Sequence, residues 1–228
     1  SDSATVFTDA AGTIPAVEND SVRHIADKSG NGNHATQADI AKAPKLRKTA
    51  GGLWYLEFDG VDDTLATANI NLSDYTEAFL AMAVRRAPNK AQFGLSHQRT
   101  SSTRIAISAS AAASNPNRAP AAFSSGAINI LPESDPLLDN VDFIASTNVF
   151  RSGASSFIDL WRDGGNFQRT TESQGDWSDS SLTIGSLLTT LAFLQGRFYG
   201  GLLRMKLASD SERRGAESAL ADKSGVTL

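Results

Sequence analysis

The chain has 228 residues, of which 40% are hydrophobic and 20% charged, and its formal net charge is -4. This composition is typical of a folded globular protein and excludes an intrinsically disordered chain. The absence of cysteine excludes disulfides, thiolate zinc sites and cysteine nucleophiles. The net negative charge, without a basic stripe, argues against nucleic acid as a partner. No apolar run approaches the ~20 residues that insertion across a membrane requires.

Short strand-like segments, separated by Gly, Asn, Asp, Ser and Pro, follow one another along the chain. The predicted strands cover residues 5–7, 53–58, 64–67, 79–84, 93–96, 104–108, 128–131, 142–150, 156–162, 182–184 and 197–207. Many short strands with frequent turns indicate an all-β sandwich or barrel. Long helices do not alternate with them, which argues against a doubly wound α/β fold.

The segment 79–84 shows the side-chain pattern that a sandwich requires. Leu80, Met82 and Val84 share one face of an extended chain, and Ala81 and Ala83 share the other. We therefore expect the larger side chains to lie between two facing sheets.

Local turn and capping signals are clear at two places. Asp163-Gly164 follows the strand 156–162 and predicts a tight reversal. Ser209 and Glu212 form a capping-box pattern that predicts the start of a helix, and Gly225 predicts its end. We expect this short C-terminal helix to pack on the rim of the sandwich.

Three segments carry a family resemblance in the correct order. Residues 27–35 read D-K-S-G-N-G-N-H-A, residues 56–65 read L-E-F-D-G-V-D-D-T-L, and residues 207–226 combine the capping-box helix with L-A-D-K-S-G-V. Together they resemble laminin-G-like, concanavalin A-like jelly-roll domains. Residues 6–13 are similar to the leader of such domains in many bacteriophage and prophage virion proteins.

The resemblance implies two antiparallel sheets packed face to face, and we expect one domain over residues 1–228. Residues 1–5 read like the interior of a domain, so we expect a module of a longer protein. It also implies recognition of sugars or surfaces from a tail, fibre or head-spike position on a virion assembled in the bacterial cytoplasm. The implied partners are a host surface glycan or polysaccharide and other virion subunits, including further copies of this chain.

The glycine-rich and aspartate-rich motifs suit turns, because glycine accepts positive φ and Asp accepts backbone N–H groups. We interpret them as structural. Asp62 and Asp63 leave a second interpretation open, since carboxylate oxygens are ligands that calcium prefers.

Catalytic patterns are incomplete. Glycosidases that share the implied fold carry E-x-D-x-x-E on one strand. Here Glu133 and Asp135 begin that pattern, but Leu138 replaces the last carboxylate and Pro136 interrupts strand pairing. We therefore expect a protein that is not an enzyme, while an unrecognised glycosidase site stays as a third hypothesis.

The strand 156–162 supplies the main binding candidate. If Ile158 and Leu160 face the core, then Phe157, Asp159 and Trp161 share the outer face. An aromatic ring beside a carboxylate suits a sugar, because C–H groups stack on the ring and the carboxylate accepts hydroxyl hydrogens. The alternative is the opposite orientation, in which Trp161 belongs to the core.

Four further residues complete the candidate glycan patch. Trp177 lies in a polar segment and serves either as a second stacking residue or as a plug at the rim. Arg99 and Arg104 suit acidic sugars or are simply solvated, and His97 is expected at the surface or in a loop. The first functional hypothesis is a glycan-binding module, and the second is a structural or decoration module without glycan binding.

Overall fold

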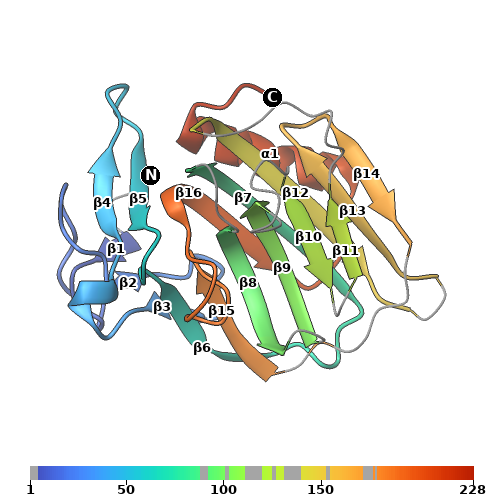
Figure 1. The fold of residues 1–228 in the computed structure, drawn as a ribbon, viewed down its shortest axis with the longest axis horizontal. Coiled ribbons are helices and arrows are strands. Elements are labelled where there is room, and N and C mark those ends of the chain that lie inside the picture. Colours follow the sequence, from blue (N-terminus) through green and yellow to red (C-terminus); the bar gives the residue numbers. More distant parts are fainter. Residues whose placement is uncertain are drawn as a thin grey trace.

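The computed structural model describes residues 5–87, 92–100, 103–110, 120–124, 127–130, 140–152, 155–171, 177 and 179–228, with the side chains of 98–100, 103, 110, 123 and 127–130 left out. Within these residues the chain forms two antiparallel sheets packed face to face, plus a C-terminal helix (Figure 1). This confirms the predicted two-sheet sandwich.

The first sheet has nine strands in the described part of the chain. Their spatial order is β1 (Val6–Phe7), β2 (His24–Ile25), β3 (Ala35–Thr36), β6 (Leu65–Asn71), β15 (Asp179–Ile184), β8 (Gln92–Thr100), β9 (Thr103–Ser110), β10 (Ala121–Ser124) and β11 (Ala127–Ile130).

The second sheet has seven described strands and positions the candidate site. Their order is β14 (Phe167–Thr170), β13 (Phe157–Arg162), β12 (Asp142–Phe150), β7 (Glu77–Arg86), β16 (Gln195–Arg204), β5 (Trp54–Asp59) and β4 (Lys45–Lys48). A short 3-10 helix, η2 (Ile40–Lys42), precedes β4.

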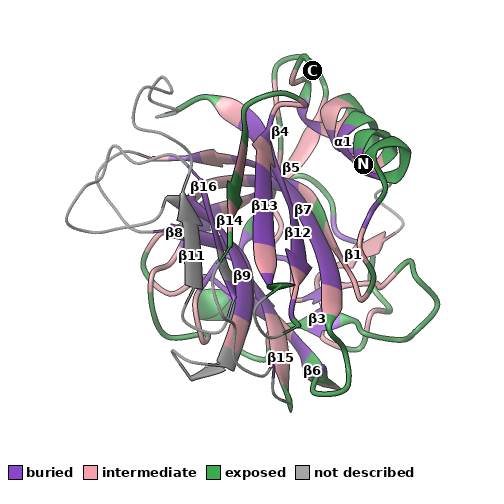
Figure 2. Ribbon diagram, turned by 90° about the vertical axis from the view of Figure 1, so that its right-hand side faces the viewer, coloured by how far each residue is buried: buried purple, intermediate pink, exposed green. Residues whose placement is uncertain are grey.

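The central strand β7 is buried on both faces. Leu80, Met82 and Val84 point into the core between the sheets, as the alternation predicts. Ala81 and Ala83 are fully buried on the opposite face, under the C-terminal helix. Small side chains on this outer face let a helix approach the sheet closely, and Figure 2 shows the resulting burial of β7 and β12.

The helix α1 (Asp210–Ser224) begins and ends where the sequence predicts. The Ser209 hydroxyl accepts the N–H of Glu212, and the Glu212 carboxylate accepts the N–H of Ser209 at 2.8 Å. Gly225 closes the helix in the left-handed conformation at φ 76°. The expected position at the rim is wrong, because α1 packs across the outer face of the seven-stranded sheet, with Leu220 buried against that face.

Polar groups of α1 are also buried against the sheet. Glu217 accepts hydrogen bonds from Ser146 of β12 at 2.5 Å and from Arg213 at 2.8 Å. Both charged side chains are nearly inaccessible to solvent. Pairing offsets the cost of burying these charges and fixes the helix over one place on the sheet.

The described helix is too short and too polar to cross a membrane.

The first loop motif has the structural role that its residue types indicate. Asp27 accepts the N–H groups of Ser29 at 2.8 Å and Asn33 at 2.9 Å, and Gly30 and Gly32 adopt φ of 84° and 75°. The motif connects β2 to β3. Asp163 and Gly164 likewise form the predicted reversal between β13 and β14, with φ of 48° and 73°.

Replacing the helix cap tests how much α1 depends on its first turn. Ser209→Ala removes the acceptor for the Glu212 N–H and is expected to lower the free energy of unfolding by about 1 kcal/mol. Urea denaturation measures this difference. Ser218→Ala, in the exposed middle of the same helix, is the control and should not destabilise the protein. An equal loss in both variants would contradict the capping role.

Candidate functional site

The proposed aromatic patch on β13 lies on the outer face of the seven-stranded sheet. Ile158 and Leu160 are fully buried in the core, so Phe157, Asp159 and Trp161 point the other way. This is the orientation in which the three side chains share the outer face.

The Asp159 carboxylate is already engaged by the protein. Its two oxygens accept hydrogen bonds from Nε and Nη2 of Arg169 on β14, at 2.5 and 2.6 Å, and the residue is only 4% exposed. A bidentate pair of this kind leaves little of the carboxylate for a ligand hydroxyl. Asp159 therefore ties β13 to β14.

The aromatic rings of this patch are half-buried and also contact protein groups. The Arg169 guanidinium lies 4.3 Å from the centre of the Phe157 ring, and the Arg213 guanidinium of α1 lies 4.6 Å from the Trp161 ring. Phe167 packs against Trp161 at 5.2 Å and is itself 53% exposed. The geometry favours a structural role, and ligand binding by these residues stays a prediction.

Trp177 does not present a ring to solvent. It is 1% exposed and belongs to the main core, where its indole N–H donates to the Ser124 hydroxyl at 3.0 Å. The prediction that Trp177 stacks on a ligand is therefore wrong, because its ring is buried in the core. Its polar sequence neighbours conceal the burial, because the contacts come from residues distant in the chain.

His97 is also buried, contrary to the expected surface or loop position. It lies in β8 with no exposed surface, and its Nε2 lies 2.9 Å from the carbonyl oxygen of Ile70. Burial lowers the pKa of His97 and of half-buried Arg104, which lies on the neighbouring β9. The side chain of Arg99 and the residues Glu133 and Asp135 lie outside the described residues.

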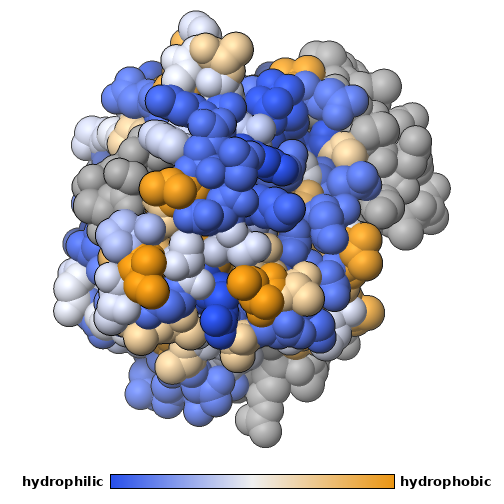
Figure 3. Space-filling view, turned by 90° about the vertical axis from the view of Figure 1, so that its left-hand side faces the viewer, coloured by the Kyte–Doolittle hydropathy of each residue, from blue (hydrophilic) through white to orange (hydrophobic). Residues whose placement is uncertain are grey.

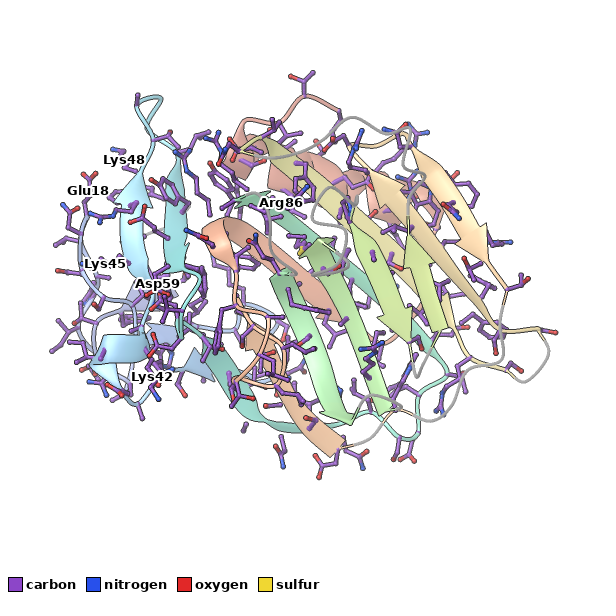
Figure 4. All side chains as sticks on the ribbon, in the orientation of Figure 1. Glu18, Lys42, Lys45, Lys48, Asp59 and Arg86 are labelled. Carbon is purple, nitrogen blue, oxygen red and sulfur yellow. The ribbon has the colours of Figure 1, made fainter. Side chains whose placement is uncertain are left out.

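A polar hollow of about 690 Å³ lies elsewhere, beside the end of β7 and the beginning of β16. We call it the polar hollow. Its charged and amide-bearing lining residues are Lys45, Arg47, Arg85, Arg86, Arg197, Glu57, Asp59, Asp63, Asn140 and Gln195. Figure 4 shows Lys45 and Asp59 on the β4–β5 side and Arg86 beside the end of β7.

Strand register aligns a row of charged residues, four of which line the hollow. Lys45 of β4 pairs with Glu57 of β5, Glu57 with Arg197 of β16, Arg197 with Arg85 of β7, and Arg85 with Asp142 of β12. We call these five residues the charged row. They are exposed or half-buried, because they lie on the outer face of the sheet.

The two carboxylates of the charged row bind arginines. Arg47 donates from Nε to Glu57 at 2.8 Å, and Arg85 donates from Nε to Asp142 at 2.9 Å. The hydrogen bond from Arg85 to Asp142 raises the pKa of the Arg85 guanidinium. Both pairs hold planar polar groups in defined orientations at the edge of the hollow.

Two tyrosines orient the central arginine of the row. The Arg197 guanidinium lies 4.6 Å from the centre of the Tyr55 ring and donates to the Tyr199 hydroxyl at 3.3 Å. The two rings pack at 5.7 Å. Burial raises the pKa of Tyr199, which keeps its hydroxyl protonated at neutral pH.

The carboxylates at the other side of the hollow close a turn. Asp63 accepts the N–H of Asp59 at 2.9 Å, and Asp59 accepts the N–H of Val61 at 2.7 Å. Gly60 adopts φ of 79°, and a Cβ there would lie 2.6 Å from the Cβ of Gln195. The turn therefore fixes its carboxylates through backbone hydrogen bonds.

Oxygens of Asp59, Asp62 and Asp63 all come within 4.8 Å of one another. Such oxygens suit calcium, although Asp59 and Asp63 already accept backbone N–H groups. Burial raises the pKa of Asp63 to about 6, and this opposes the ionised form that a cation would need. Calcium binding by Asp62 and Asp63 stays a prediction.

The sequence-based candidates did not include the charged row. Alternation in the segments 53–58 and 79–84 predicts which side chains face outward, but it does not predict which strands are neighbours. β4 was also missed, because its sequence K-L-R-K holds one apolar residue and lacks a strand signal.

No protein family and no curated protein matches this chain. Solved structures do share its fold. Domain 4 of AbnA, an extracellular GH43 arabinanase from Geobacillus stearothermophilus in complex with arabinotriose, has a TM-score of 0.59 at 8% identity, over 78% of this chain and 81% of that one.

Two larger proteins contain a similar sandwich. An arabinofuranosidase complexed with arabinofuranosyl-α-1,2-xylobiose has a TM-score of 0.58 at 15% identity, over 90% of this chain. The binding domain of botulinum neurotoxin serotype D has a TM-score of 0.56 at 9% identity, over 86% of this chain. The chain spans about half the length of these two, 51% and 49% respectively. At such identities the likeness shows the fold alone.

The raised pKa of Asp63 predicts a pH-dependent effect of Asp63→Asn. The pKa of Asp63 in the folded protein, about 6, exceeds its ordinary value of 3.8, so this carboxyl lowers the free energy of unfolding as the pH rises from about 4 to about 6, and by a constant amount above that range. The variant keeps an oxygen acceptor for the Asp59 N–H. Its free energy of unfolding should rise relative to the wild type, by on the order of 1–2 kcal/mol, between pH 4.5 and pH 7.5. Urea denaturation at both pH values measures this change, and a constant difference would contradict it.

Proposed function

We propose that this chain is a non-catalytic carbohydrate-binding module that holds a saccharide in the polar hollow. The observation that carries the proposal is the lining of the hollow, where guanidinium, carboxylate and amide groups converge from four strands and the adjoining loops. Each sugar hydroxyl both donates and accepts hydrogen bonds, so a saccharide needs this mixture of partners. A hollow of about 690 Å³ also lies within the usual range for small-ligand sites.

The structural comparisons support this proposal through related architectures. Domain 4 of the arabinanase was solved with arabinotriose, and the neurotoxin domain is named as a binding domain. The arabinanase domain thus carries a saccharide on a similar sandwich, whereas this chain matches 49% of the neurotoxin binding domain. Since fold does not fix function, the proposal depends on the hollow itself.

The carboxylates of the hollow support binding more than hydrolysis. Asp59 and Asp63 accept backbone N–H groups and close a turn, and Glu57 binds Arg47. A glycosidase needs one carboxyl group as an acid and a second as a base or nucleophile. Since an arabinofuranosidase shares the fold, a polysaccharide hydrolysis screen belongs with the binding assay, and turnover would contradict the proposal.

We further place the module on the surface of a phage-type virion, where it would take part in host recognition. The support is the ordered set of motifs at residues 6–13, 27–35, 56–65 and 207–226. Antibodies raised against the domain should label intact particles in electron micrographs. A parent protein absent from particles would contradict this placement.

The structural or decoration alternative would require a sizeable apolar or self-complementary surface. Figure 3 shows the side that carries β1–β5, where apolar side chains are scattered singly over a hydrophilic surface. On this side of the molecule, small separated apolar groups favour a surface that stays solvated.

Filling the hollow should weaken saccharide binding. Ala41 of η2 lines the hollow and is exposed, so Ala41→Trp introduces a large ring without removing a charged group. We expect affinity for the saccharide found on a glycan array to fall at least about tenfold, a cost of about 1.4 kcal/mol. Ala50→Trp, in the exposed turn after β4 and outside the hollow, is the matched control and should bind normally. Equal binding by both variants would place the saccharide elsewhere.

A further inference from the structure

We propose that the polar hollow selects saccharides that carry a carboxylate, and that Arg197 binds this group. The inference rests on the proposed function, because it names the ligand class of the same hollow. Its starting point is the distribution of charge along the charged row.

The lining of the hollow holds more cationic than anionic side chains, and Asp142, the further carboxylate of the charged row, lies outside this lining. Five cationic residues, Lys45, Arg47, Arg85, Arg86 and Arg197, line the hollow beside three carboxylates, Glu57, Asp59 and Asp63. An excess of one sign in a recess raises the local concentration of the opposite charge. The hollow therefore favours an anionic ligand, although the whole chain has a net charge of -4.

Arg197 is the arginine of the row whose neighbours do not neutralise it. Glu57, its partner on one side, binds Arg47, and Asp142 binds Arg85. Within the described part of the chain, Arg197 makes no ion pair, and its polar contact is with the neutral Tyr199 hydroxyl. A carboxylate ligand would supply the missing partner.

The position of Arg197 also has an electrostatic cost. It lies directly opposite Arg85 in the strand register, and like charges in cross-strand pairs are destabilising. A bound anion between or beside these two guanidinium groups would offset that repulsion.

The guanidinium of Arg197 is held ready for a planar ligand group. The contact with the Tyr55 ring restrains its position, and one hydrogen bond to Tyr199 uses a single Nη1–H. A guanidinium has five N–H donors in a fixed fork, so enough remain for two parallel hydrogen bonds to one carboxylate. Lys45, exposed on β4 at the edge of the row, adds a second cation that solvent and ligand can reach.

Matched pairs of acidic and neutral saccharides test the inference. The probes are tri-galacturonic acid with α-1,4-galactotriose, and sialyllactose with its methyl ester, which lacks only the carboxylate charge, each titrated calorimetrically into the wild-type chain. For at least one pair we expect affinity for the acidic member to exceed that for the neutral member by tenfold or more. The preference should weaken as salt rises, because ions screen the charge.

Variants then assign the preference to Arg197. Arg197→Gln should reduce the acidic preference to less than about twofold, while Arg197→Lys should keep part of it, because lysine retains the charge without the planar fork. Arg214→Gln removes the same charge from the exposed side of α1 and should leave the preference unchanged. Thermal unfolding of each variant confirms that the sandwich is intact.

The outcomes separate this inference from the proposed function. Equal affinity for acidic and neutral members would overturn the carboxylate preference and leave carbohydrate binding standing. An acidic preference that survives Arg197→Gln would overturn the role of Arg197. Failure to bind any member of the pairs would overturn the inference, and failure across a full glycan array would overturn the proposed function as well.

Discussion

One apolar row across the seven-stranded sheet determines the position of its neighbours. Leu46, Leu56, Phe198, Val84 and Phe143 are paired in register across β4, β5, β16, β7 and β12, and all five are buried in the core. Burial of each such side chain contributes roughly 1.5–3 kcal/mol. If one strand slipped by one residue, all of its buried apolar side chains would move to the outer face. The register of the strands is therefore strongly specified.

The charged row is the direct consequence of this apolar row. Successive residues of a strand point to opposite faces, so Lys45, Glu57, Arg197, Arg85 and Asp142, next to the five core residues, all point outward. The core thus aligns charged side chains from strands that lie far apart in the chain. The rigid sheet fixes their spacing, which a flexible loop would not do.

The helix α1 divides the outer face of the sheet into different environments. It covers Phe79, Ala81 and Ala83, and its Arg213 extends over Trp161. On that side, the Asp159 carboxylate and the aromatic rings of the β13 patch contact arginines of the protein. The charged row, at the end of the strands, remains accessible to solvent. The same outer face therefore carries both a structural cluster and the hollow that we propose binds a saccharide.

The sequence by itself determined the local features, because their physical causes act over a few residues. Alternation at 79–84, the turn at Asp27 and the cap at Ser209 all follow from neighbouring side chains and backbone groups. Only the tertiary structure decided which strands are neighbours, and it brought Lys45 into one row with Asp142. It also buried Trp177, since burial depends on contacts between segments distant in sequence, which no local pattern encodes.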